Sequence, residues 1–166
     1  DGGVNIYDSK AGTFSVFSKI PKMGTNIHSV YYQKENGDMW IGTRFNGLFR
    51  YNIKTGATHK YLRSHGMDSE GVFYFARQRR GRLWVATMQG LRYYDPKTDT
   101  FLSLHDKMLD AAFIYTLFVD KDDNLWVGSA NFGIFRIDAH TGRITNIRKE
   151  SHRGLEDNYI ISLFQD

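Results

Sequence analysis

The chain repeats one short pattern three times, and this repetition limits the possible folds more than any other feature. The pattern is an apolar run that contains a tryptophan, a small residue two positions later, and a glycine that opens the next run. The three tryptophans are Trp40, Trp84 and Trp126, spaced 44 and 42 residues apart. A period in the forties with a Trp-containing strand is typical of the blades of a β-propeller.

Each repeat is expected to form four strands. In the first repeat we expect strands at 27–33, 39–43, 48–51 and 58–62. The turn before the second of these strands contains Asn36-Gly37, a strong hairpin signal because both central residues of such a turn adopt positive φ. The three complete repeats are expected to form blades at about 26–62, 72–104 and 113–147.

The run around each tryptophan is apolar on consecutive residues, as in Met39, Trp40 and Ile41. A strand with one face in water would alternate between apolar and polar residues. Both faces are therefore expected to be covered, as they are when four-stranded sheets stack side by side. We predict that the tryptophans lie between neighbouring blades and not in a binding site.

Partial repeats occupy both ends of the chain. Residues 1–17 match the last two strands of a repeat, and residues 159–166 match the first strand of another. No segment shows a helical period. We therefore expect residues 1–166 to form a single all-β segment, a β-propeller fragment of three full blades with a partial blade at each end. Each full blade is expected to be a four-stranded antiparallel sheet.

The two partial repeats both lack the Trp-containing strand, so they cannot join into a fourth blade at normal strand spacing. We therefore expect an open arc excised from a larger ring, in keeping with a chain that begins Asp-Gly-Gly without a methionine. Sheet faces and edges left open in this way are prone to association with other protein surfaces. The expected partners are other blades of a parent protein or another copy of the chain, and self-association is predicted.

Composition limits the function only slightly. The chain carries 22 basic and 18 acidic residues, a net charge of +4 that is compatible with an anionic partner without requiring one. The absence of cysteine excludes disulfides and thiolate metal sites. No apolar run reaches the length of a membrane helix, so no membrane contact is expected within this segment. No cofactor is expected either.

The repeats closely resemble the two-component-regulator propeller repeat. Its pattern contains Asp-x-x-Gly, Leu-Trp-Ile-Gly-Thr, Gly-Leu-x-x-Tyr-Asp and x-x-Thr-Gly, and all three full repeats and both partial ones fit it. The departures are Ala86 for Gly, Ser129 for Thr, Asp99 for Gly, and the missing aspartate of the first hairpin. The resemblance therefore covers essentially the whole chain.

This resemblance implies a propeller in the periplasmic sensor region of a bacterial hybrid two-component receptor. Such a sensor would bind a glycan-derived oligosaccharide and signal to a histidine kinase elsewhere in the parent, without catalytic residues in this segment. Two alternatives remain, a protein-interaction scaffold and a glycan-cleaving enzyme. Asp68 with Glu70, or Glu156 with Asp157, would have to supply the acid and base of the enzyme.

Ligand binding is expected on one face of the propeller. The loops between the second and third strands of each blade share this face with the loops between blades. Aromatic faces, amides and cations there suit sugar hydroxyls and acidic sugars. The candidate ligand-binding residues are Arg44, Phe45, Asn46, Arg63, His65, Gln89, Asn131, Phe132, His152 and Arg153.

Two other features have simpler explanations. Arg77, Arg79, Arg80 and Arg82 cluster at a hairpin on the opposite face, where they form a solvated turn or an anionic or inter-domain contact. Nucleic acid is not expected, because one hairpin is not a basic stripe. The segment 120–124 resembles the start of a calcium loop but lacks its glycine and its final glutamate, so a tight hairpin explains it better.

Overall fold

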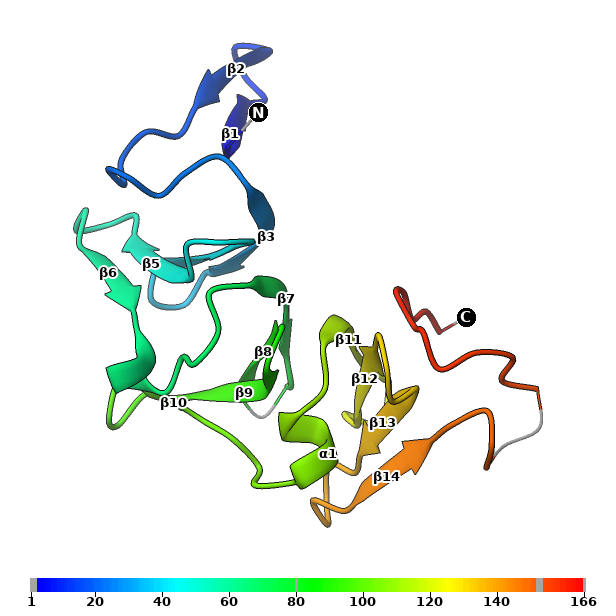
Figure 1. Ribbon diagram of the computed structural model, residues 1–166. Helices are drawn as coiled ribbons and strands as arrows, with labels where there is room; N and C mark the ends of the chain where they lie inside the picture. Colours follow the sequence, from blue (N-terminus) through cyan, green and yellow to red (C-terminus); the bar gives the residue numbers. More distant parts are fainter. Residues whose placement is uncertain (1–2, 80, 152–153, 166) are drawn as a thin grey trace.

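The computed structural model describes residues 3–79, 81–151 and 154–165, which form three full blades and one partial blade along an open arc (Figure 1). The first blade contains β3 (Ile27–Gln33), β4 (Asp38–Thr43), β5 (Leu48–Asn52) and β6 (Thr58–Tyr61). The second contains β7 (Val72–Arg77), β8 (Leu83–Thr87), β9 (Gly90–Asp95) and β10 (Thr100–Leu102). The third contains β11 (Ile114–Val119), β12 (Leu125–Ser129), β13 (Ile134–Ile137) and β14 (Ile144–Ile147). The partial blade before them contains β1 (Asn5–Asp8) and β2 (Thr13–Val16).

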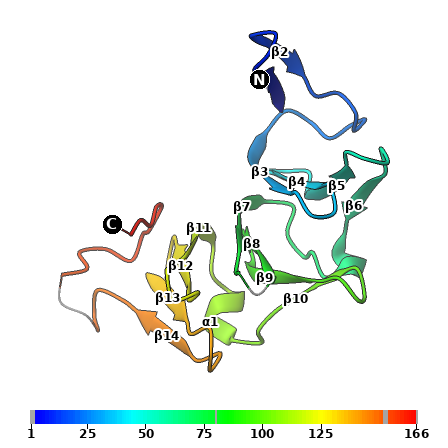
Figure 2. The ribbon, with the colours of Figure 1, turned by 180° about the vertical axis from the view of Figure 1, so that it is seen from behind.

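Within each blade, every strand pairs antiparallel with the next strand in the chain, so each full blade is a four-stranded meander. The all-β propeller fragment expected from the repeats is therefore confirmed. The first strands of the blades, β3, β7 and β11, face the concave side of the arc, and β6, β10 and β14 lie on its outer side (Figures 1 and 2). The two chain ends lie at opposite ends of the arc.

One backbone hydrogen bond recurs between consecutive blades. The N–H of the glycine that opens or precedes each third strand donates to a carbonyl just before the first strand of the next blade. Gly47 donates to Glu70 at 2.8 Å and Gly90 to Ala112 at 2.8 Å. Gly133 makes the same bond to Asn158 at 2.9 Å. These three glycines have φ of 81°, 91° and 69°, a conformation that side chains with a Cβ disfavour, which explains why glycine recurs there.

Trp40 and Trp84 lie in the seams between blades, as predicted, whereas Trp126 lies on the open face of the third blade and is only half-buried. Trp40 is completely buried, and its ring lies 4.8 Å from that of Tyr94 and 5.9 Å from that of Phe101 in the second blade. Trp84 is 1% exposed in a core cluster that it shares with the third blade. Stacked blades thus bury both faces of each inner sheet, which is why the sequence around each tryptophan is continuously apolar.

A polar network also crosses the first seam. The Arg50 guanidinium lies over the Trp40 ring and donates to the Tyr94 hydroxyl at 2.7 Å and to the Asp99 carboxylate at 3.0 Å. The Tyr61 hydroxyl donates to the same carboxylate at 2.6 Å. Asp99 adopts a φ of 54° at a turn position where the other two full repeats have glycine. The aspartate at this position therefore lacks the conformational freedom of glycine in the turn, but it supplies an acceptor that links two blades.

The C-terminal segment differs from its expected secondary structure. Residues 159–165 form no strand, because no Trp-containing partner strand is there to pair with them. They nevertheless lie where the first strand of a further blade would lie. A Cβ on Gly128 would meet Ile160 at 2.8 Å, just as a Cβ on Gly42 would meet Val72 at 2.7 Å. The Ile160 N–H also donates to the Ser129 carbonyl at 2.8 Å.

Two short helical turns correct the expectation of no helix. A 3-10 turn, η1 (Arg63–His65), and one α-helical turn, α1 (Lys107–Asp110), lie in loops between blades. The Asp106 side chain accepts hydrogen bonds from the N–H groups of Met108 and Leu109 and thereby caps α1. A single turn is too short to produce a helical period in the sequence. No helix in the described ranges is long and apolar enough to cross a membrane.

Candidate functional site

Loops from different parts of the chain meet on the face where we predicted ligand binding. Asn46, from the loop between β4 and β5, and Arg63, from the loop after β6, line one hollow of about 450 Å³. The other lining residues are Gly47, Lys60, Tyr61, Leu62, Met67, Asp68, Ser69 and Glu70. The structure thus brings together two of the predicted residues.

Two charged residues of this hollow, Arg63 and Asp68, are paired with each other, and Asp68 also pairs with Arg92. Arg63 lies 3.7 Å from Asp68, and Arg92 lies 3.4 Å from both Asp68 and Asp110. The Arg92 side chain is only 10% exposed, so these carboxylates balance a nearly buried cation. Because Asp68 is engaged in this way, it is a poor candidate for the general acid or base of the enzyme alternative.

Three of the predicted polar side chains hold loops in place. The Asn46 amide donates to the carbonyls of Lys22 and Met23 at 2.7 and 3.0 Å and ties the preceding loop to the first blade. The Asn131 amide oxygen accepts the Phe113 N–H at 3.3 Å. His65 accepts the Leu62 N–H at 3.1 Å through Nδ1. Their roles in ligand binding stay predictions, and each has a structural task already.

The remaining predicted residues differ in accessibility. Phe132 is half-buried and packs against the core of the third blade. Phe45 is 60% exposed, and the Gln89 side chain is also exposed. His152 and Arg153 lie outside the described residues. Phe45 and Gln89 are therefore predicted residues whose side chains face solvent without a structural task that the hydrogen bonds reveal.

Arg44 is an exposed cation on this face. Its side chain is exposed, and the guanidinium lies 5.2 Å from the Phe45 ring centre. Within the described ranges, no carboxylate lies at ion-pair distance from it. An unpaired cation beside an exposed ring is suited to an anionic group on a ligand with a flat apolar face.

Next to Arg44 runs a series of aromatic rings that sequence reasoning missed. The ring centres of His28 and Phe73 lie 4.6 Å apart, and those of Phe73 and Phe113 lie 5.0 Å apart. Phe113 stacks on Tyr115 at 4.5 Å, and Tyr115 meets Tyr159 at 5.6 Å. We call these five side chains the aromatic row. It runs from the first blade to the C-terminal segment.

β-Bulges create this row. The pairing register shifts between Ile27 and Ser29 in the first blade, and the same shift recurs at Phe73 and Tyr115. A bulge leaves one residue unpaired and redirects its side chain. His28, Phe73 and Tyr115 are these unpaired residues. Their equivalent positions in the repeats are a signal in the sequence, but nothing in one sequence marks a bulge in advance.

A rim of loop residues borders the row. The rim consists of Arg44, Met88 and Ala130, which occupy the same place in the three repeats. The N–H of each donates a hydrogen bond of 2.8 to 3.1 Å to the carbonyl of the residue just before the first strand of its own blade. Gly71 makes room for Met88, because a Cβ there would meet the Met88 sulfur at 2.5 Å. The rim therefore changes from cationic in the first blade to apolar in the second and third.

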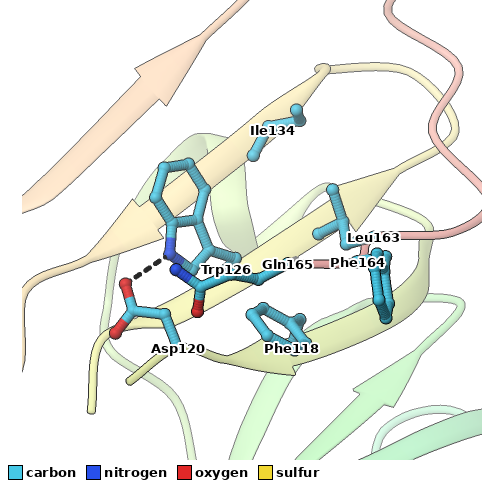
Figure 3. Close-up of a pocket in the computed structure, with 7 residues that line it drawn as sticks. All are labelled: Phe118, Asp120, Trp126, Ile134, Leu163, Phe164 and Gln165. Carbon is cyan, nitrogen blue, oxygen red and sulfur yellow. Dashed lines mark hydrogen bonds between the residues drawn. The ribbon is translucent and has the colours of Figure 1, made fainter. Parts of the chain in front are cut away.

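A different hollow, of about 300 Å³, lies on the open face of the third blade (Figure 3). It is lined by Phe118, Asp120, Trp126, Ile134, Leu163, Phe164 and Gln165. Trp126 is the counterpart of Trp40 and Trp84, which the following blade covers. This hollow is therefore a seam without its second blade, and we do not assign it to a small ligand.

Asp120, the first carboxylate that a calcium loop would need, already has other partners. Asp120 accepts hydrogen bonds from the side chains of Asn124 and Trp126 at 2.9 and 2.8 Å and from two backbone N–H groups of its own hairpin. Burial opposes its ionisation, but these donors outweigh burial and hold the pKa of Asp120 below its usual value. The described residues contain no group of three or more His, Asp and Glu side chains placed to hold a metal ion.

The basic cluster at the hairpin after β7 is partly used within the fold. Arg77 pairs with Glu35 of the first blade at 3.0 Å. The Arg82 guanidinium lies 4.4 Å from the Tyr93 ring centre and 5.3 Å from that of Trp84. Arg80 lies outside the described residues. Contacts within and between blades therefore account for Arg77 and Arg82 without an external anion.

Comparison with known families identifies the repeat. The family model described as two component regulator propeller matches residues 108–131, which include β11, β12 and the last three residues of α1. Residues 108–131 are thus similar to the two-component-regulator propeller repeat. The resemblance drawn from the Trp-centred motifs is thereby confirmed. No curated protein sequence matches the chain.

Solved structures with this fold include a bacterial extracellular domain, a bacterial surface component and a lyase. The extracellular domain of a putative hybrid two-component system from B. thetaiotaomicron is 21% identical, with a TM-score of 0.72, over 88% of this chain and 22% of that one. PorZ, a surface component of the type-IX secretion system of Porphyromonas gingivalis, is 16% identical, with a TM-score of 0.73, over 94% and 25%. A virginiamycin B lyase from Staphylococcus aureus is 15% identical, with a TM-score of 0.66, over 88% and 48%. This chain spans about a fifth of the first structure, and at these identities the likeness shows the fold alone.

Proposed function

We propose that the chain is a ligand-sensing propeller segment of a bacterial two-component receptor and that it binds a glycan-derived oligosaccharide on its loop face. The matched repeat and the likeness to extracellular domains of hybrid two-component systems support the sensor class. The parent protein would place this segment in the periplasm and carry the histidine kinase. Within this segment the expected role is binding without catalysis.

The observation that carries the sugar proposal is the aromatic row beside the unpaired Arg44. Sugar rings expose flat patches of C–H groups that pack on aromatic faces, and their hydroxyl groups need nearby polar partners. Tyr159 is 52% exposed and His28 is also exposed, so the row presents rings to solvent at both ends. Gln89 and Phe45 add an amide and another ring on the same face.

The lyases that share this fold do not change the proposal. Their likeness is at 15–18% identity and concerns the propeller alone. Asp68 is held by two arginines, and Asp157 accepts the N–H of Tyr159 at 3.1 Å. Both carboxylate pairs that the enzyme alternative requires therefore include a member with a structural task. A sensor needs only reversible binding, which the loop face is equipped to provide.

The test is calorimetry of the chain against a panel of neutral and acidic oligosaccharides, followed by chromatography of the recovered sugars. We expect at least one sugar to bind and to be recovered intact. The double substitution Phe45→Ala with Gln89→Ala should weaken binding, whereas His140→Ala, at an exposed turn on the opposite face, should not. Cleavage of the sugar would favour the enzyme. Failure of the whole panel to bind would contradict the proposal and favour a protein-interaction scaffold.

A further inference from the structure

We propose that Arg44 and the aromatic row together form a directional site for an oligosaccharide whose terminal sugar carries a carboxylate. The acidic sugar would lie at Arg44 over the first blade, and the following sugars would extend along the row toward Tyr159. This inference rests on the proposed function, because it names the ligand class and orientation for the same face. It adds residues His28, Phe73, Phe113, Tyr115 and Tyr159, which the sequence did not single out.

The positive charge of Arg44 marks one end of the proposed site. The Arg44 guanidinium is exposed and, among the described residues, has no carboxylate at ion-pair distance. Burial and the positive charge of Arg44 lower the pKa of His28, so His28 is neutral near pH 7. Arg44 therefore supplies a full positive charge at the first-blade end of the row. Its planar fork can donate two parallel hydrogen bonds to one carboxylate.

The aromatic row forms a continuous surface. Successive ring centres in the row lie between 4.5 and 5.6 Å apart, so each ring contacts the next. Phe73, only 6% exposed, is the buried support in the middle. The more exposed rings on either side of it are those available to a ligand. His28, Phe73 and Tyr115 belong to β3, β7 and β11, the strands on the concave side of the arc (Figure 1).

The rim gives the proposed site a direction. The rim changes from Arg44 to Met88 to Ala130 along the three blades, so only its first position is charged. Met88 is 41% exposed and can pack against the apolar side of a sugar ring. A ligand with charges on every sugar would leave most of them next to apolar side chains, where they lose hydration without gaining a partner. The rim therefore favours one acidic sugar at the Arg44 end followed by neutral sugars.

The experiment compares two probes on the same chain. One is a galactotriose whose non-reducing sugar is oxidised to galacturonic acid, and the other is the neutral galactotriose. Calorimetry at low salt should show the acidic probe binding about tenfold more tightly, because a charge-assisted hydrogen-bonded pair is stronger than neutral contacts. Raising the salt to about 0.3 M should reduce this preference, since exposed charges are screened.

Substitutions assign the preference to the proposed residues. Arg44→Gln should remove the preference and leave the affinity for the neutral probe within about twofold. Tyr159→Ala should weaken both probes by a similar factor, because that ring contacts the neutral sugars. Arg143→Gln is the matched control, since Arg143 is an exposed arginine in a turn on the opposite face. Melting curves establish that each variant is folded, and Arg44 is exposed enough for its substitution to leave the fold intact.

The possible results separate this inference from the proposed function. Equal affinity for the two probes, or a preference that survives Arg44→Gln, would overturn the inference while leaving a sugar-binding loop face in place. A tighter affinity for tri-galacturonic acid than for the singly charged probe would overturn the direction proposed from the rim. Failure of every sugar in the wider panel would contradict the proposed function itself.

Discussion

Removing one tryptophan tests the seams on which the whole architecture depends. Trp84 is 1% exposed, its ring lies edge-on to Tyr93 at 5.4 Å, and its N–H donates to the Gln78 side chain at 2.9 Å. It shares a core with Leu117, Leu125 and other residues of the third blade. Trp84→Ala would therefore remove packing from both blades at once and leave a cavity that neither backbone can close.

The expected loss is about 3–5 kcal/mol, the usual cost of truncating a buried aromatic side chain to alanine. With a urea dependence of about 2 kcal/mol per molar, the unfolding midpoint should fall by about 2 M. The measurement is urea unfolding followed by circular dichroism, with the slope checked for two-state behaviour. Such a loss is a large part of the total stability of a domain, which is commonly about 5–15 kcal/mol.

Trp126 supplies a matched control, because it has the same place in its repeat but lines the open hollow of the third blade (Figure 3). Trp126→Ala should cost less than half as much as Trp84→Ala, since the side chain is only half-buried and no second blade packs on it. Equal losses at the two positions would refute the argument that the seam supplies the stability. An unchanged midpoint for Trp84→Ala would refute it as well.

Two further predictions concern charge and association. Burial raises the pKa of Asp99, but hydrogen bonds from Tyr61 and Tyr94 and the charge of Arg50 outweigh this and lower it below 3.8. A lowered folded-state pKa gives stability that is present above the unfolded pKa and lost as the pH falls through the folded one. Acid unfolding should therefore be steeper below about pH 4 in the wild type than in Asp99→Asn, and identical acid profiles would contradict the role of this carboxylate. Self-association is expected through open apolar surface such as Phe14 and Phe164, which are 74% and 87% exposed. Light scattering should show it at high protein concentration, and a monomer throughout would argue against it.

The fold was largely predictable because its causes are local and repeat. The Trp-containing runs showed which strands need cover on both faces, and the predicted first strand of the first blade, 27–33, is the observed β3. The sequence has a glycine where each third strand begins, and Gly47, Gly90 and Gly133 all adopt positive φ. Such features depend on neighbours in the chain, so that a single sequence contains them.

The candidate site was predictable only in part. The sequence placed Arg44 and Asn46 on one face, but it could not show that the Asn46 amide is held by Lys22 and Met23, or that Arg44 has no described carboxylate at ion-pair distance. Those distinctions depend on which side chain meets which across a loop. The hairpin at Asp120 shows the same limit, since only its bonded partners separate a turn from a calcium ligand.

By itself, the sequence determined the blade period, the four strands of each full repeat and the burial of Trp40 and Trp84 in seams, because strand alternation and turn chemistry act over a few residues. Only the tertiary structure decided where the C-terminal segment lies, why aspartate replaces glycine at Asp99, and that the bulges align His28, Phe73 and Tyr115 beside Arg44. Each of these depends on contacts between residues more than 30 positions apart in the chain. Such contacts exist only once the blades have stacked.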